Sequence, residues 1–153
     1  YTGEEMPVIM EVEIPASVSE NKTVQGKFFS AEYKTSVSRV SFIYIGRVNS
    51  CRSGGCSAPS QSMEKEDSEF FDYFILFDNE MAILLVKVFN YQATHGQEIT
   101  SRGWLKQFSG FNGSQNLTVG KEIDGISGAT ISVYGITADI QIKSGMLRDI
   151  IHQ

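Results

Sequence analysis

The sequence predicts an α+β fold, in which a largely antiparallel sheet carries a short helix and a C-terminal helix packed on it. Segments of strand length rich in aromatic and β-branched residues occupy the first ninety positions. Apolar residues at helical spacing then recur from about residue 130 to residue 151. A chain of 153 residues can bury about two thirds of its unfolded surface in one core. We therefore expect a single domain over residues 1–153.

The N-terminal third predicts three strands. The first covers Val8–Ile14 and ends at Pro15, which cannot donate a hydrogen bond inside a central strand. The polar residues 17–22 predict a turn, and residues 24–33 and 39–48 predict two further strands.

Residues 49–68 predict a long loop, because serine, glycine and charged residues leave no apolar period there. Such a loop is either an insertion with a function of its own or a partly disordered surface segment, and we expect the second. It holds Cys51 and Cys56, the two cysteines of the chain. Their spacing allows either a small disulfide loop or a pair of free thiols. With His95 and His152, the two histidines, they form only a weak zinc pattern.

A hairpin is expected next, with strands Phe70–Phe77 and Met81–Tyr91 around the turn Asp78-Asn79-Glu80. Both alternating faces of these strands are apolar, which predicts a second layer over each face of the sheet.

Two helices are expected to supply that cover. Thr100 or Ser101 can cap a short helix that Gly110 ends and that carries Trp104, Leu105 and Phe108. The second begins near Thr130 and continues to Ile151, with apolar residues at helical spacing: Val133, Ile136, Ile140 and Leu147.

Composition excludes several classes of function. The net charge is −5 and the basic residues are scattered, so no basic patch favours nucleic-acid binding. The longest apolar run, Met81–Val86, is far shorter than the roughly 20 residues of a membrane span. The glycine spacing of a P-loop is not met, and neither is that of a nucleophile elbow.

A glycine-bearing turn directly precedes the long helix. Gly125 and Gly128 permit unusual backbone angles, and Gly128 and Ala129 leave room for a bulky group beside Thr130. The positive end of the helix would face a group on Thr130, which suits a phosphate. The residues alone favour a plainer interpretation, in which Ser127 or Thr130 simply caps the helix.

The segment Asp124-Gly125-Ile126-Ser127-Gly128-Ala129-Thr130 resembles the flavinylation motif of extracytoplasmic FMN-binding domains. Such domains occur in the Rnf complex, the sodium-pumping NADH:quinone reductase and nitrous-oxide-reductase regulatory membrane proteins. The resemblance implies that Thr130 takes FMN through a phosphoester, installed from FAD by a magnesium-dependent flavin transferase outside the cytoplasmic membrane. It also implies that the Gly128 and Ala129 amides satisfy phosphate oxygens. Asp124 would either help to bind magnesium during transfer or cap the turn.

A second block, residues 94–110, is similar to the small-residue turn and short helix upstream of the motif in that family. The resemblance offers Thr94, His95, Gly96 and Glu98 as candidates to line the flavin ring or the ribityl chain. The family pattern is only partly kept, because Gln92 and Ala93 precede Thr94 and Glu98 replaces the last glycine. Trp104 would stack on the flavin or, more simply, pack the short helix.

By resemblance the chain is an electron-carrier domain rather than a stand-alone enzyme, with membrane redox proteins as electron donor or acceptor. The first residue is Tyr1 rather than methionine, which suggests that a leader or anchor precedes this numbering. We therefore expect an extracytoplasmic, membrane-anchored location. The alternative is a non-flavinylated binding module of an exported lipoprotein.

Overall fold

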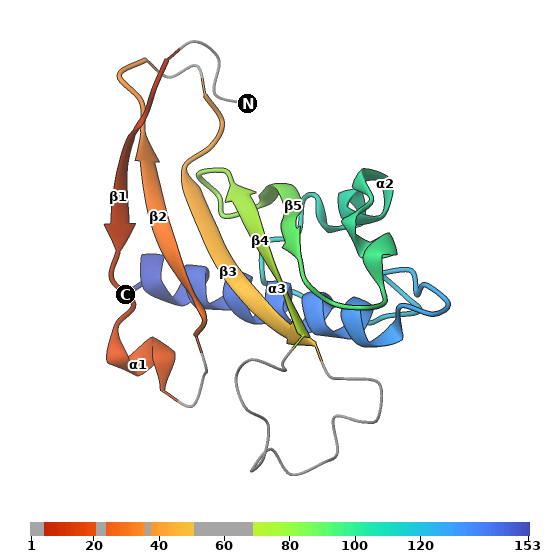
Figure 1. Cartoon of the computed structure of the whole chain (residues 1–153). Helices are drawn as coiled ribbons and strands as arrows, with labels where there is room; N and C mark the ends of the chain where they lie inside the picture. Colours follow the sequence, from red (N-terminus) through yellow and green to blue (C-terminus); the bar gives the residue numbers. More distant parts are fainter. Residues whose placement is uncertain (1–4, 21–23, 36–37, 51–68) are drawn as a thin grey trace.

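The fold is a five-stranded sheet backed by one long helix. A computed structural model describes residues 5–20, 24–35, 38–50 and 69–153. All neighbouring strands are antiparallel and follow the chain order β1-β2-β3-β4-β5. Helix α3 runs across the back of the sheet (Figure 1). The α+β fold that the sequence predicts is therefore confirmed. The strands are β1 (Val8–Val12), β2 (Gly26–Glu32), β3 (Phe42–Ser50), β4 (Glu69–Phe77) and β5 (Ile83–Tyr91). The α-helices are α1 (Ala16–Ser19), α2 (Arg102–Leu105) and α3 (Thr130–Ile151).

Several local expectations were wrong. Strand β1 ends at Val12 rather than Ile14, β3 begins at Phe42 rather than residue 39, and β5 begins at Ile83 rather than Met81. Residues 16–19 form one helical turn, α1, where the sequence predicts only a turn, because Val18 can bury its side chain there. Strand β3 continues to Ser50, so the predicted loop begins later than residue 49; its remainder, with Cys51 and Cys56, lies outside the described residues. The left-handed residue of the β4–β5 connection is Met81 (φ 64°), which the sequence assigns to the strand and not to the turn Asp78-Asn79-Glu80. Asp78 instead accepts bonds from two turn amides with its carboxylate.

The core lies between α3 and the inner face of the sheet. The four helix residues expected at core positions, Val133, Ile136, Ile140 and Leu147, are all fully buried. They oppose the alternate sheet residues that point inward, including Phe28, Tyr44, Tyr73, Ile75 and Val86. Burial against the sheet thus holds α3 continuous through Gly135, Thr137 and Ile142, which are poor helix formers.

Two glycines make room for Tyr44 in this core. Gly26 and Gly46 are register partners on β2 and β3, and a Cβ added to either would lie 2.5 Å or less from the Tyr44 hydroxyl oxygen. That hydroxyl is buried and has no hydrogen-bond partner in the described part of the chain. Burial raises the pKa of the Tyr44 and Tyr73 hydroxyls above their ordinary value of 10.0, and the nearby Asp139 carboxylate raises both further.

These two tyrosines predict a loss of stability at alkaline pH. The unfolded chain releases both protons near pH 10 while the folded chain keeps them, so folding stability is complete below that pH and falls above it. The slope should be on the order of 1.4 kcal/mol per pH unit for each tyrosine. Urea unfolding on both sides of the tyrosine pKa measures it. Tyr44→Phe should reduce the slope, and an unchanged slope in this variant would contradict the assignment.

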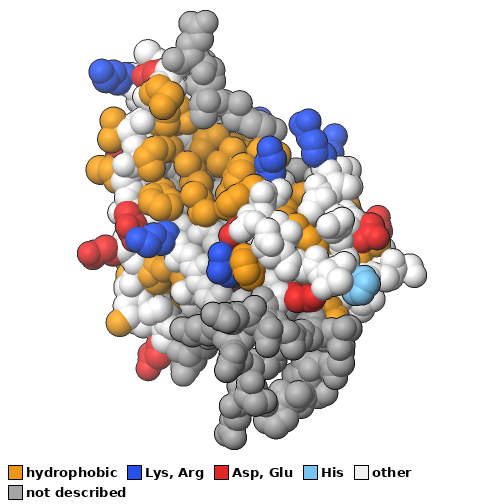
Figure 2. Space-filling model, in the orientation of Figure 1, with side chains coloured by type: hydrophobic (Ala, Val, Ile, Leu, Met, Phe, Trp, Pro, Cys, Tyr) orange, Lys and Arg blue, Asp and Glu red, His pale blue; other side chains and the backbone are white. Residues whose placement is uncertain are grey.

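The outer face of the sheet is largely apolar, and no helix or strand among the described residues covers it, where the sequence predicts a layer on both sides. Helix α3 covers only the inner face, because Phe29, Ile43, Phe74, Leu76 and Leu85 alternate outward along their strands and remain partly exposed. Figure 2 shows this apolar surface spread over the strands. Its polar edges carry the ion pairs Lys27–Glu11 and Arg47–Asp72.

The two faces should differ sharply in their contribution to stability. Ile75 on β4 is fully buried, whereas Ile45 on the neighbouring β3 is 42% exposed on the outer face. Ile75→Ala should cost about 2–5 kcal/mol of unfolding free energy, because it leaves a cavity against α3. Ile45→Ala should cost less than about 1 kcal/mol. Denaturant unfolding measures both, and equal costs would show that the outer face is packed in solution.

The short helical segment lies along the free edge of β5. Ser101 is its N-cap, with Oγ accepting a bond from the Trp104 amide at 3.2 Å, and α2 is flanked by the 3-10 turns η2 (Gln97–Thr100) and η3 (Lys106–Phe108). Gly110 ends the segment with φ 86°, as expected. The next residues pair with the edge, since Ile83 N–H donates to Phe111 O and Gly110 N–H donates to Ile83 O. The edge strand is thus protected from further pairing.

Candidate functional site

The turn before α3 places Thr130 at the start of the helix. Gly128 has φ 83°, a left-handed angle that favours glycine, and nothing lies within 4 Å of where its Cβ would be. Ala129 is the N-cap residue, and no side chain caps the helix. Thr130 is the first helical residue and its side chain is exposed. Its hydroxyl is therefore accessible from outside at an open helix end.

The free donors at this end are helix amides. The resemblance implies that the Ala129 amide binds a phosphate oxygen. In the structure this amide instead donates to Ile126 O at 3.1 Å and is therefore occupied. The N–H groups of Thr130, Ile131 and Ser132 come in the first turn, where the helix itself offers no acceptors. Helix α3 has 22 residues, and its dipole adds positive potential at this end. A phosphate on Thr130 would therefore meet donors from the first turn and open space beside Gly128.

The short helix holds the beginning of the motif in place. Trp104 Nε1–H donates to Asp124 O at 2.9 Å, and Asp124 N–H donates to Gln107 Oε1 at 2.8 Å. Trp104 is only 8% exposed and packs edge-on against Phe108. Packing, the simpler of the two roles considered for Trp104, therefore accounts for its position. The Asp124 carboxylate is exposed and makes no hydrogen bond within the described residues, so the turn is held by the backbone of Asp124 and not by its side chain.

Tyr91 and Ser132, which the sequence analysis missed, connect the end of β5 and the loop after it to the first turn of α3. The Tyr91 hydroxyl lies 2.9 Å from Ser132 Oγ and also donates to His95 O. Tyr91 ends β5, Ser132 lies in the first turn of α3, and the side chain of Ser132 is 4% exposed. Burial is the main cause that raises the pKa of Tyr91 above its ordinary value of 10.0, so the hydroxyl keeps its proton beyond the pH at which a free tyrosine loses it. The sequence offered one sign of this contact, which is that Ser132 is a polar residue beside the apolar helix positions Val133 and Ile136.

The predicted ring-lining residues form a loop beside this contact. Gly96 is buried with φ 88°, while Thr94, His95 and Glu98 are exposed. Thr94 is tied back to β4, because its amide and its hydroxyl both donate to the Glu69 carboxylate. The structure thus brings the 94–98 loop against the first turn of α3, close to the motif in space though about thirty residues earlier in the chain.

Gly96 should be the least replaceable residue of this loop. An added Cβ would lie 2.6 Å from Ser132 Oγ and 2.8 Å from the Tyr91 hydroxyl, at a φ that alanine rarely adopts. Gly96→Ala should therefore cost about 1–3 kcal/mol and displace the loop from α3. Gly120→Ala is the matched control, with φ 93° and open space around its Cβ. Thermal unfolding of both variants measures the difference, and equal losses would mean that strain alone, without the Tyr91–Ser132 contact, sets the cost.

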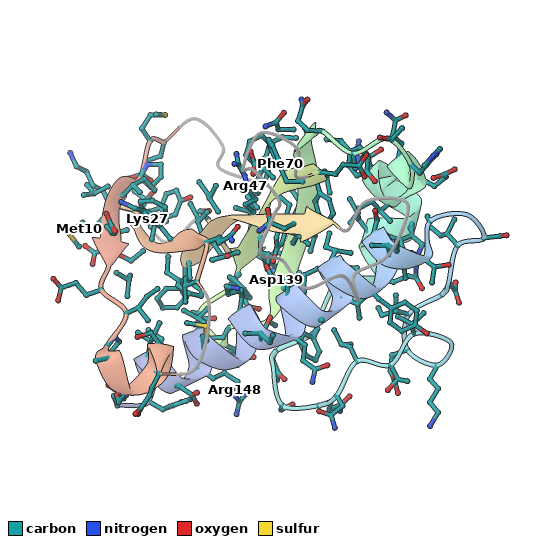
Figure 3. All side chains as sticks on the ribbon, turned by 60° about the horizontal axis from the view of Figure 1, so that its bottom comes forward. Met10, Lys27, Arg47, Phe70, Asp139 and Arg148 are labelled. Carbon is teal, nitrogen blue, oxygen red and sulfur yellow. The ribbon has the colours of Figure 1, made fainter. Side chains whose placement is uncertain are left out.

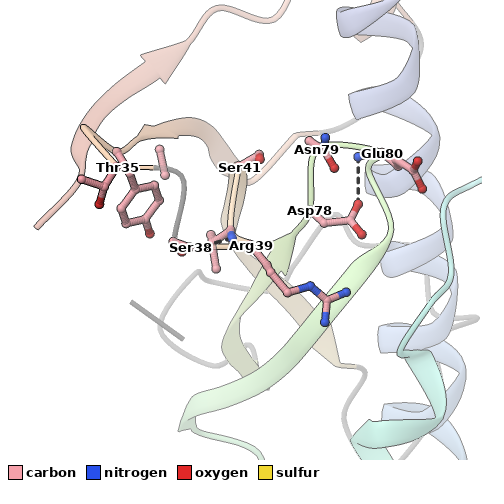
Figure 4. Close-up of a pocket in the computed structure, with 10 residues that line it drawn as sticks. Thr35, Ser38, Arg39, Ser41, Asp78, Asn79 and Glu80 are labelled. Atoms are coloured by element: carbon pink, nitrogen blue, oxygen red, sulfur yellow. Dashed lines mark hydrogen bonds between the residues drawn. The ribbon is translucent and has the colours of Figure 1, made fainter. Parts of the chain in front are cut away.

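A separate cavity of about 610 Å³ lies at the other end of the sheet, around the β4–β5 turn. Its walls include Thr35, Arg39 and Glu80, and the Asp78 carboxylate there accepts from the Glu80 amide (Figure 4). None of the predicted site residues lines it.

The described residues contain no group of three or more histidine, cysteine, aspartate or glutamate side chains placed to hold a metal ion. Within the same ranges, no helix has the length and apolar character that crossing a membrane requires.

Comparison with known proteins identifies one family. Residues 68–141 match the sequence model of the FMN-binding domain. The match runs from the start of β4 through the 94–98 loop and the motif into the first half of α3, so it contains every residue of the site described above. No curated protein and no solved structure is significantly similar to the chain. Residues 68–141 therefore form a region of the FMN-binding domain type.

Proposed function

We propose that Thr130 carries FMN through a phosphoester and that the chain serves as an electron-transfer domain. The observation that carries this proposal is the exposed Thr130 hydroxyl at the first position of a 22-residue helix whose end has no side-chain cap. The first-turn amides would bind the phosphate oxygens, and Gly128 would leave space for the ribityl chain. Asp124, Ser127 and Ala129 would complete the turn around the attachment point.

The attachment step needs a second protein. Thr130 Oγ would attack the FMN phosphorus of FAD, the bond between the two phosphates would break, and AMP would leave with the hydroxyl proton. Magnesium and the general base would come from a flavin transferase, because the described part of this chain offers no metal cluster. The accessible Thr130 side chain suits modification by an external enzyme.

The role of the chain after attachment is to position and tune the flavin. The bound ring supplies one- and two-electron chemistry. The Thr94–Glu98 loop and the exposed side chains near Thr130 would set its surroundings, and electron donors and acceptors would be membrane redox proteins. Such a maturation route would require the domain to lie outside the cytoplasmic membrane, beside its membrane redox partners.

The test is intact mass. The exported chain, co-expressed with a flavin transferase, should gain one FMN less one water, and peptide fragmentation should place the added mass on Thr130. The purified protein should keep flavin absorbance after denaturation. A chain that stays unmodified beside a modified positive control would contradict the proposal and favour the non-flavinylated binding module.

A further inference from the structure

Two large apolar side chains stand exposed beside the attachment point. Ile131 is 45% exposed and Tyr134 is 56% exposed, although both belong to the first turns of a helix whose other apolar residues in this region are buried. Tyr134 has no aromatic partner, and its hydroxyl has no hydrogen-bond partner within the described residues. Among the described residues, packing and hydrogen bonding therefore give no reason for an aromatic residue at this position.

Helix geometry places Tyr134 over Thr130. Residues four apart lie on the same helix face, with Cβ atoms about 5–6 Å apart. Long helical side chains lean toward the N-terminus, so the surface that Tyr134 covers is the turn that contains Thr130. The next position on this face toward the C-terminus is Ala138, which is exposed and small. It offers the Tyr134 ring little surface to pack against in that direction.

Tyr134 cannot turn into the core instead. Ser132, Val133 and Ile136 fill the buried face of these turns. At Gly135 the helix approaches the sheet so closely that an added Cβ would lie 3.2 Å from Val48 Cγ1. The phenol ring is thus confined to the outer side of α3.

The 94–98 loop meets the helix on another side. It contacts α3 through Ser132, which follows Thr130 by two residues and is rotated about 200° from it around the helix axis. A flat group tethered at Thr130 would have to pass around the end of the helix to reach that loop. The same group would reach Tyr134 and Ile131 without passing around the helix end.

We propose that Tyr134, with Ile131 beside it, is the platform on which the isoalloxazine ring lies. This inference rests on the proposed attachment of FMN at Thr130. An aromatic ring stacked on another gains favourable offset contact, and the ring would cover apolar surface that is otherwise in water. One face of the ring would then lie on Tyr134 while the opposite face stays open to a redox partner. The 94–98 loop would act mainly as a support for the first turn of α3.

The test uses flavin fluorescence in the flavinylated protein. A phenol in contact with the excited ring quenches its emission by transient electron transfer and back-transfer, and a phenyl group does not. Tyr134→Phe should therefore raise the flavin fluorescence several-fold with attachment unchanged by intact mass. Tyr134→Ala should also weaken the visible circular dichroism of the flavin, because the ring loses its platform. Tyr33→Phe, on the far end of the sheet near the 610 Å³ cavity, is the matched control and should change neither signal.

The outcomes separate this inference from the proposed function. If the wild-type chain gains no FMN mass, both proposals fail. If FMN is attached but Tyr134→Phe is no brighter than wild type, or Tyr134→Ala keeps the full circular dichroism, only the platform is overturned. A large effect of Glu98→Gln or His95→Ala in that case would place the ring over the loop.

Discussion

Replacing Thr130 with alanine should abolish covalent flavin attachment completely. The reason is chemical, since alanine has no oxygen to form the phosphoester. Because Thr130 is exposed at the first helical position, the variant should lose less than about 0.5 kcal/mol of stability. Intact mass and thermal unfolding of the same preparation separate lost attachment from lost folding.

Two variants sharpen this expectation. Thr130→Ser keeps a hydroxyl and should keep attachment at a reduced rate, because it lacks the methyl group that restricts the threonine rotamer. Ser127→Ala removes the neighbouring exposed hydroxyl three residues earlier and should leave the mass adduct intact. An adduct that survives in Thr130→Ala and disappears in Ser127→Ala would assign the tether to Ser127.

Replacing Asp139 with asparagine should destabilise the protein by about 3–5 kcal/mol. Lys143 is 2% exposed, and its Nζ lies 2.6 Å from Asp139 Oδ1. The Tyr73 hydroxyl donates to the other Asp139 oxygen at 2.5 Å. Figure 3 shows Asp139 on the side of α3 that faces the sheet. Without the carboxylate, the Lys143 charge would remain buried, and a neutral amide oxygen and the ring of Tyr44, 5.5 Å away, would be its partners among the described residues.

The control for Asp139 is an ion pair on the open face. Arg47 Nε donates to Asp72 Oδ1 at 2.7 Å, but the Arg47 side chain is 43% exposed, so Asp72→Asn should cost about 1 kcal/mol or less. Denaturant unfolding measures both variants. The double variant Asp139→Leu, Lys143→Met should recover much of the loss, because it removes both charges. If Asp139→Asn costs no more than Asp72→Asn, the buried pair does not contribute as argued.

The sequence by itself determined the parts of this protein that depend on local pattern. Two strand-length runs, apolar on both faces and joined by a polar turn, predicted the hairpin of β4 and β5, and helical spacing predicted α3 from Thr130 to Ile151. Both patterns lie within one local segment, so no knowledge of distant residues is needed to read them. The Asp124–Thr130 motif is equally local. It predicted the FMN-binding domain, which the family match supports, whereas Thr130 as the attachment point stays a prediction.

Only the tertiary structure decided which distant residues meet. Tyr91 reaches Ser132 across 41 positions and Tyr73 reaches Asp139 across 66, and no spacing rule predicts either contact. The open outer face was also beyond the sequence, because apolar residues on both faces of a strand look the same whether one face or both are covered. Strand order and the path of α3 set which face is buried. The threonine could therefore be found from the motif, while its neighbours in space required the fold.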